Sequence, residues 1–232
     1  MKVSPHGYVL VLALSAAVSA GAQTGFPFQD ETLHYTVNWP SGLSLGDAAL
    51  MAHRQGARWD LEMNLDARIP GFPIADRFHS MAGADLCSDE FERSTSHGAR
   101  KSTEKTTYDY KTGTARRATA NGGGSTEFTI PPCARDALAF LYFARREMGQ
   151  GRVAPAQQIF FGSVYSIRLE YTGAQTITAR EQQAVTDRVL VTLRGPASSA
   201  NFEIFFARDA ARTPLLVRVP LSVGTFSLEL AR

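Results

Sequence analysis

The stretch that decides the fold runs from Pro131 to Arg145 and reads PPCARDALAFLYFAR. Its segment from Ala137 to Ala144 is apolar on every side of a helical wheel, which predicts a helix that is buried all round. Pro131 and Pro132 end any preceding strand and suit the start of a helix. Asp136 falls in the first turn, where a carboxylate accepts free backbone N–H groups and complements the helix dipole. We therefore expect one buried helix capped by Asp136.

On both sides of this helix the sequence alternates with period two, as amphipathic β-strands do. In Glu31 to Trp39 (ETLHYTVNW) every second residue is apolar, and Arg58 to Leu65 repeats the pattern. After the helix, further alternating sets begin at Tyr165, Val189, Phe202, Leu215 and Phe226. The sequence predicts about eleven strands and one inserted apolar helix.

The helix is too small to cover such a sheet. Eleven strands spaced about 4.8 Å apart span about 50 Å, whereas a helix about 10 Å across covers only two or three of them. Because one face of nearly every strand is apolar, the rest must be buried in another way. We expect a mainly β fold in which a large curled antiparallel sheet, an open or half barrel, holds the helix in its mouth or concave face. Two packed sheets, or a ligand in the hollow, would meet the same need.

The first 22 residues have the pattern of a secretory signal peptide. Lys2 supplies a positive charge, Tyr8 to Val18 supplies an apolar run, and Ala20-Gly21-Ala22 matches a cleavage site. The run is shorter than the roughly 20 apolar residues of a spanning helix. We expect cleavage near Ala22, which leaves residues 23–232 as a single β-rich domain, periplasmic or secreted, with no membrane span. An uncleaved anchor is the alternative.

Cys87 and Cys133 are the two cysteines of the chain. In an oxidising compartment an even pair predicts a disulfide. Closing a loop of this length stabilises a fold by about 4 kcal/mol in the chain-entropy picture. Two free thiols, or one reactive thiol with a pKa lowered at the helix start, are the alternatives. A reactive thiol also needs a base, and no histidine lies near Cys133 in the sequence.

Charge and motifs exclude several function classes. The formal net charge is +2, whereas a nucleic-acid-binding protein normally has a concentrated basic stripe. The histidines lack metal-ligand spacing and there is no Gly-x-Ser-x-Gly motif, so the sequence predicts no metal, no cofactor and no catalytic residue. Asp60 and Glu62 lie on one strand face about 7 Å apart, a separation that glycosidases use. The polar face of an amphipathic strand, which Asp60 and Glu62 form together with Asn64, is the strongly favoured explanation.

Four motifs in order resemble domain-of-unknown-function family 3108, a group of exported bacterial proteins. They are Glu31-x-Leu33-x-Tyr35-x-Val37-x-Trp39 with Leu45-Gly46, Asp136-Ala137-Leu138-x-x-Leu141-Tyr142-x-x-Arg145, Asp209-x-x-Arg212-x-Pro214, and Gly224-x-Phe226-x-x-Glu229-Leu230. The resemblance implies a periplasmic, mostly antiparallel β fold with one inserted helix, and it brings no established activity. The strand after Leu45-Gly46 departs from the family pattern because it has few large residues.

The leading hypothesis is a non-enzymatic envelope protein whose curled sheet holds a lipid or another apolar small molecule. The aromatic residues expected to line the hollow, or else to fill a closed core, are Trp39, Trp59, Phe140, Tyr142, Phe143, Phe202 and Phe206. The alternative is an interaction or assembly factor with a fully packed core, which binds an envelope protein through a sheet edge or the predicted hairpin Lys105 to Thr119. A hydrolase that uses Asp60 and Glu62 is the least favoured hypothesis.

Overall fold

The structure is a computed structural model that describes residues 30–69, 72–120, 122–196, 198–222 and 224–231. The expected signal peptide, residues 1–22, lies outside these ranges. Before the helix the chain forms β1 (Asp30–Asn38), β2 (Ser44–Gln55), β3 (Arg58–Ile69), β4 (Phe72–Gly83), β5 (Ser88–His97), β6 (Arg100–Asp109), β7 (Thr114–Thr119), β8 (Ser125–Thr129) and β9 (Arg135–Asp136). The helix α1 (Ala137–Gly149) is followed by β10 (Gln157–Phe160), β11 (Val164–Ala179), β12 (Gln182–Arg194), β13 (Ser199–Ala207), β14 (Pro214–Leu221) and β15 (Gly224–Leu230).

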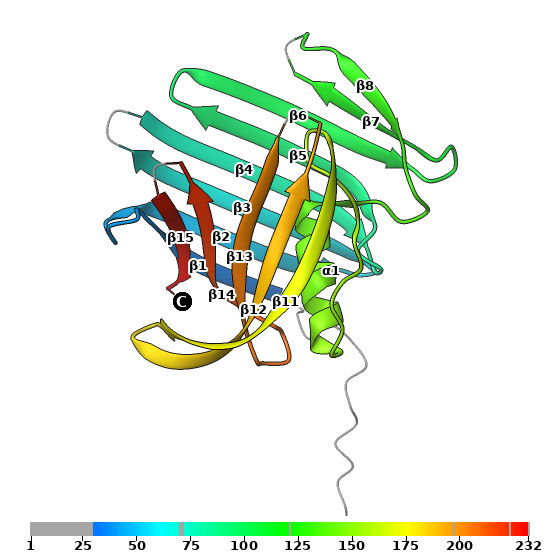
Figure 1. Cartoon of the computed structure of the whole chain (residues 1–232). Coiled ribbons are helices and arrows are strands. Elements are labelled where there is room, and N and C mark those ends of the chain that lie inside the picture. The colour runs from blue at the N-terminus through cyan, green and yellow to red at the C-terminus, as the bar shows by residue number, and fades with distance from the viewer. Residues whose placement is uncertain (1–29, 70–71, 121, 197, 223, 232) are drawn as a thin grey trace, which may run out of the picture.

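Within the described ranges all fifteen strands belong to one sheet, in the order β8-β7-β6-β5-β4-β3-β2-β1-β15-β14-β13-β12-β11-β10-β9 (Figure 1). The predicted mainly β fold, a large curled sheet with one inserted helix, is confirmed. The predicted number of about eleven strands is wrong. Strands β9 and β10 have two and four residues, which is too short for an alternating pattern to appear in the sequence. These two strands pair in parallel, whereas the other neighbours are antiparallel.

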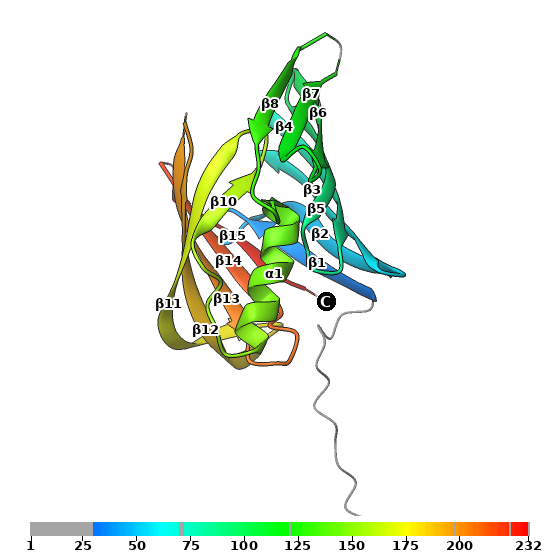
Figure 2. The ribbon, with the colours of Figure 1, turned by 90° about the vertical axis from the view of Figure 1, so that its right-hand side faces the viewer.

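The sheet has two flanks, one formed by β1 to β8 and the other by β9 to β15. It curls until its edge strand β9 reaches β5, in the middle of the first flank. There the backbone N–H of Ser88 in β5 donates to the carbonyl of Ala134, which precedes β9, at 2.9 Å. Strands β6, β7 and β8 therefore continue past the point of contact, and Figure 1 shows them projecting from the rest of the sheet. Figure 2 shows the two flanks facing each other, with α1 between them. The shape is an open barrel that overlaps itself.

The helix α1 is the main element inside the curl. Its buried residues are Leu138, Ala139, Phe140, Tyr142, Phe143, Ala144, Arg145 and Met148. Because these positions surround the helix axis, α1 is covered on all sides, as its composition predicts. In the part of the chain that the structure describes, no helix is long and apolar enough to cross a lipid bilayer.

A second, small core lies on the other face of the sheet. A bulge lies between Tyr171 and Gly173 of β11, and the backbone of Gly173 has φ +112° there. The bulge changes the direction of the part of β11 that follows it, residues 173–179, which we call its outer half. Ile177 on that half packs with Phe205 and Leu216, which lie opposite one another on β13 and β14. The outer half of β11 thus covers apolar side chains that the concave face cannot bury.

Close packing of β2 against β3 explains why glycine stands at position 46 of the Leu45-Gly46 motif. A Cβ atom at this position would lie 2.0 Å from the carbonyl oxygen of Asp66 on β3, so no side chain fits there. The inward-facing residues that follow on β2 include Ala48 and Ala52, which are small and buried. Small residues at these positions keep β2 from filling the space in front of α1.

Candidate functional site

An apolar cavity lies between α1 and the concave face of the sheet. Its volume is about 470 Å³. One wall is a stripe of α1 residues spaced i, i+3, i+4, i+7, namely Ala137, Phe140, Leu141 and Ala144. The opposite walls come from both flanks of the curled sheet and include Tyr35, Ala48, Leu50, Met63, Leu65, Phe78, Ile167, Leu169, Val191, Leu193, Phe202, Ile204, Phe206, Val217, Val219 and Leu228.

Among the residues that the structure describes, the lining carries no charged side chain. Its polar hydroxyl belongs to Tyr35, which donates to the backbone carbonyl of Pro214 at 3.0 Å. Burial raises the pKa of Tyr35 far above its usual value, so this hydroxyl stays neutral. A group that enters the cavity therefore meets hydrocarbon and aromatic surface. Among the described lining side chains, the oxygen of Tyr35 is the one hydrogen-bonding atom, and it can only accept because its hydrogen is donated to Pro214.

Of the seven aromatic residues predicted to line the hollow, Phe140, Phe202 and Phe206 do so. Trp39 instead packs edge-to-face on Phe226 beyond the end of β1, with ring centroids 4.9 Å apart. Trp59 is buried in the core below the guanidinium of Arg54. The remaining two belong to other faces of α1: Tyr142 donates to Glu31 at 3.3 Å, and Phe143 lies under the guanidinium of Arg135 at 3.8 Å.

Among the described residues, the prediction missed three aromatic lining residues, Tyr35, Phe78 and Phe161. The rings of Phe78 and Phe161 lie 5.3 Å apart. Phe161 follows the short strand β10, which has no recognisable pattern in the sequence. The α1 stripe has the i, i+3, i+4, i+7 spacing of one helical face. The sequence did not reveal it, because every neighbouring position of α1 is apolar as well.

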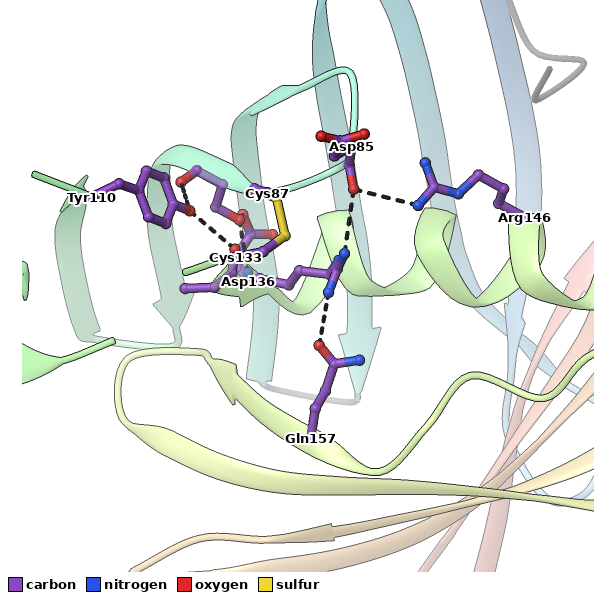
Figure 3. Close-up of a disulfide and its surroundings, with 10 residues drawn as sticks. Asp85, Cys87, Tyr110, Cys133, Asp136, Arg146 and Gln157 are labelled. Carbon is purple, nitrogen blue, oxygen red and sulfur yellow. Dashed lines mark hydrogen bonds between the residues drawn. A yellow bond between two sulfur atoms is a disulfide. The ribbon is translucent and has the colours of Figure 1, made fainter. Parts of the chain in front are cut away.

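The start of α1 is fixed to β4 and β5 by a disulfide and a buried carboxylate. Cys87 and Cys133 form the predicted disulfide, and Figure 3 shows it beside the first turn of the helix. Asp136 is the N-cap residue, and its Oδ1 accepts from the backbone N–H groups of Leu138 and Ala139 at 2.8 and 3.0 Å. Cys133 thus has a structural role, which excludes the reading as a reactive thiol.

The second oxygen of Asp136 binds two serine hydroxyls. Ser80 of β4 and Ser88 of β5 each donate to Oδ2 at 2.6 Å, and Ser88 Oγ accepts from the Asp136 backbone N–H at 2.8 Å. Complete burial raises the pKa of Asp136, while these hydrogen bonds act in the opposite direction. The network joins α1 to the flank that carries the cavity residue Phe78.

Replacing Asp136 by alanine should lower the free energy of unfolding by about 2 kcal/mol, because the helix loses its cap and two buried hydroxyls lose their acceptor. Asp136→Asn keeps an acceptor for the helix N–H groups and should lose less. A raised folded-state pKa gives stability that is present below the unfolded value and is lost as the pH rises through the folded pKa. The deficit of Asp136→Asn relative to wild type should therefore shrink from about pH 4 to about pH 7. Urea unfolding at both pH values measures this, and a deficit that grows with pH would contradict it.

The other side of α1 is held by a buried ion pair. The side chain of Arg145 is 0% exposed, and its guanidinium contacts Glu31 of β1 through two hydrogen bonds of 2.7 and 2.8 Å. Arg145 and Arg146 both lie near the C-terminal end of α1, where positive charge is favourable to the helix dipole. Only Arg146 lies at the surface there, because Arg145 turns inward and joins the helix to the first strand.

The two carboxylates considered for hydrolysis lie on the outer face of the sheet. With His79 of the neighbouring strand they form a group whose potential ligand atoms all lie within 4.8 Å of one another. His79 Nε2 lies 2.8 Å from Asp60 Oδ1, and Gln55 donates to Asp60 Oδ2 at 3.0 Å. One imidazole and two carboxylates are ligand types that zinc accepts. Sequence spacing does not reveal the group, since His79 meets Glu62 only through strand pairing.

Comparisons with known proteins agree with this architecture. The sequence model of the family described as "Protein of unknown function (DUF3108)" matches residues 34–231. Among curated proteins none matches the chain. A solved structure of a β-barrel-like protein of the DUF1849 domain from Brucella abortus is similar, with a TM-score of 0.62 and 8% sequence identity, over 87% of this chain and 95% of that one.

Two further solved structures are more distant. One is a candidate lipoprotein from Parabacteroides distasonis, with a TM-score of 0.36 and 6% identity, over 88% of this chain and 95% of that one. The other is a candidate exported protein with a YmcC-like fold from Bacteroides fragilis, with a TM-score of 0.34 and 8% identity, over 90% of this chain and 96% of that one. For the Brucella abortus protein, the 8% identity means that the likeness concerns the fold alone.

Proposed function

The chain belongs to the DUF3108 family of proteins of unknown function, and we propose that it is an exported, non-enzymatic binding protein that holds a hydrophobic ligand in its curled sheet. The proposed place of action is the periplasm or the cell exterior, after cleavage of the signal peptide near Ala22. The observation that carries the proposal is the apolar cavity of about 470 Å³ between α1 and the sheet.

An empty cavity of this size is unfavourable. Apolar surface that stays in contact with water costs about 25 cal/mol for each Å², so a guest that covers the lining stabilises the protein. Water is a poor filling, because an ordered water needs two to four polar partners, and the described lining side chains offer only the oxygen of Tyr35. An apolar guest removes the penalty.

Volume and lining together define the guest. Ligand cavities in proteins commonly measure about 300–1,000 Å³. If a chain carbon takes about the space of one liquid water molecule, roughly 30 Å³, the cavity of about 470 Å³ holds on the order of fifteen carbon atoms. A single long alkyl or acyl chain has this volume and needs no polar partner. We propose that the bound part of the ligand is such a chain.

The other two hypotheses receive less support. An assembly factor with a fully packed core would leave no cavity in front of α1. A hydrolase based on Asp60 and Glu62 would work on the outer face of the sheet, away from the apolar cavity, where Asp60 is already hydrogen-bonded to His79 and Gln55.

Lipid extraction of the purified protein, followed by mass spectrometry, tests the proposal directly. We expect single-chain lipids in the extract, in amounts near one per protein. A delipidated sample should take up a fluorescent fatty acid. An empty extract together with no uptake would refute the function.

Filling the cavity should abolish uptake. Ala48 is 4% exposed and lines the cavity, so phenylalanine at this position would occupy the space of the ligand. We expect Ala48→Phe to weaken fatty-acid binding by roughly tenfold or more, because the phenylalanine ring occupies space that the acyl chain needs. The matched control is Ala174→Phe, at an exposed position of β11, which should bind as wild type does. Unchanged binding by a folded Ala48→Phe protein would place the ligand elsewhere.

A further inference from the structure

The cavity opens at one end of the barrel, as the exposure of concave-face residues reveals. Along β13, Phe206 is 0% exposed, Ile204 is 7% exposed, Phe202 is half-buried and Ala200 is exposed. Strands β3, β12 and β15 show the same gradient, from Leu61, Val189 and Leu230, which are buried, to Leu65, Leu193 and Leu228, which are half-buried. In every case exposure rises toward the same end, which is opposite the end that α1 closes.

Two adjacent turns at this open end carry exposed apolar side chains. Leu43, in the turn between β1 and β2, is 65% exposed, and Leu221, at the end of β14, is 55% exposed. The two turns touch, because a Cβ on Gly224 would lie 2.6 Å from Pro40 Cγ. Beside them Trp39 packs on Phe226. Leucines this exposed, gathered with aromatic rings at a cavity mouth, mark an interaction surface.

We propose that this rim, made of Trp39, Leu43, Leu221 and Phe226, docks on the surface of a lipid bilayer and that the ligand chain passes between bilayer and cavity there. The proposal rests on the proposed function. The argument is continuity: the concave face is apolar from the cavity to the rim, so a rim seated among acyl chains gives the ligand a path that avoids water. An amphipathic helix binds a membrane by burying its apolar face at the boundary between headgroups and acyl chains, and the apolar rim would bury its side chains at the same depth.

The test compares wild type with two double variants. Leu43→Ser/Leu221→Ser removes the rim leucines, whereas Val153→Ser/Val185→Ser removes two exposed valines, 42% and 53% exposed, that lie outside the rim. Flotation with phosphatidylcholine vesicles measures docking. Uptake of a fluorescent fatty acid from a cyclodextrin complex measures the cavity without any membrane. All four positions are exposed, so both variants should keep the melting temperature of the wild type.

We expect the wild type and the valine variant to float with vesicles and the leucine variant to lose at least about tenfold in partitioning. All three should take up fatty acid from cyclodextrin equally. Flotation of the leucine variant at the wild-type level, or no flotation of any protein, would overturn the docking proposal and leave the cavity function standing. Normal flotation without uptake by any protein would overturn the cavity function instead.

Discussion

Replacing Arg145 by methionine should lower the free energy of unfolding by about 4 kcal/mol. The guanidinium of Arg145 is fully buried and contacts both oxygens of Glu31. Its Nε also donates to the backbone carbonyls of Ala211 and Arg212 at 3.1 and 3.2 Å. One side chain thus connects α1 to the first strand and to the loop between β13 and β14.

The expected loss of stability is large because the substitution leaves the carboxylate of Glu31 without its guanidinium partner. Methionine preserves the apolar stem, but the carboxylate of Glu31, 12% exposed, then keeps only weaker partners such as the hydroxyl of Tyr142. An unpaired carboxylate in this setting costs more than the ion pair contributed, since its desolvation is no longer offset. The carbonyls of Ala211 and Arg212, two half-buried residues, lose their donor as well.

Two further variants make the test specific. Arg146→Met alters the next residue of α1, whose guanidinium reaches the carbonyl of Asp85 at 3.5 Å and lies 5.3 Å from the centroid of the Phe143 ring. Because these contacts are weak and partly exposed, this variant should lose less than about 1 kcal/mol. In Glu31→Leu/Arg145→Met both charges are absent, so the double variant should recover part of the stability that Arg145→Met loses. Urea unfolding of all three proteins provides the values. A loss below about 1 kcal/mol for Arg145→Met, or no recovery in the double variant, would contradict a buried pair.

Sequence reasoning found most strands because period-two alternation depends only on which face of a strand is buried. Leu33, Tyr35 and Val37 are buried in β1 as the pattern predicts. Strands β9 and β10 are defined instead by pairing at the edge of the sheet, where the curl brings distant segments together. Pairing of this kind depends on tertiary closure, and local sequence does not encode it.

The candidate site likewise contains residues that alternation in the sequence identified and residues that only the folded structure brings together. Phe202 and Phe206 were found because they alternate on β13 and face the hollow. Residues of α1 could not be assigned in this way. A helix that is apolar all round has no distinguished face, so Tyr142 and Phe143 look equivalent to Phe140 until their neighbours are known. Glu31 and Arg145, 114 positions apart, pair only once the sheet has curled.

Removing the Cys87–Cys133 disulfide should lower the free energy of unfolding by about 4 kcal/mol, an effect as large as that of Arg145→Met. The bond closes a loop of 46 residues, and the open chain gains the corresponding freedom mainly in the unfolded state. Cys87→Ser/Cys133→Ser tests this by urea unfolding. Wild type in dithiothreitol should match the double variant, and dithiothreitol should leave the double variant unchanged.

The native structure should survive this loss locally, because the start of α1 has a second attachment. Asp136 still accepts from Ser80 and Ser88 in the reduced protein, so helix content should stay near the wild-type value at low denaturant. The cavity wall begins at Ala137, four residues after Cys133, and the reduced form should therefore still bind fatty acid while it unfolds more easily. A normal free energy of unfolding combined with lost binding would show the reverse: that the disulfide acts on the shape of the cavity and does little to restrict the unfolded chain.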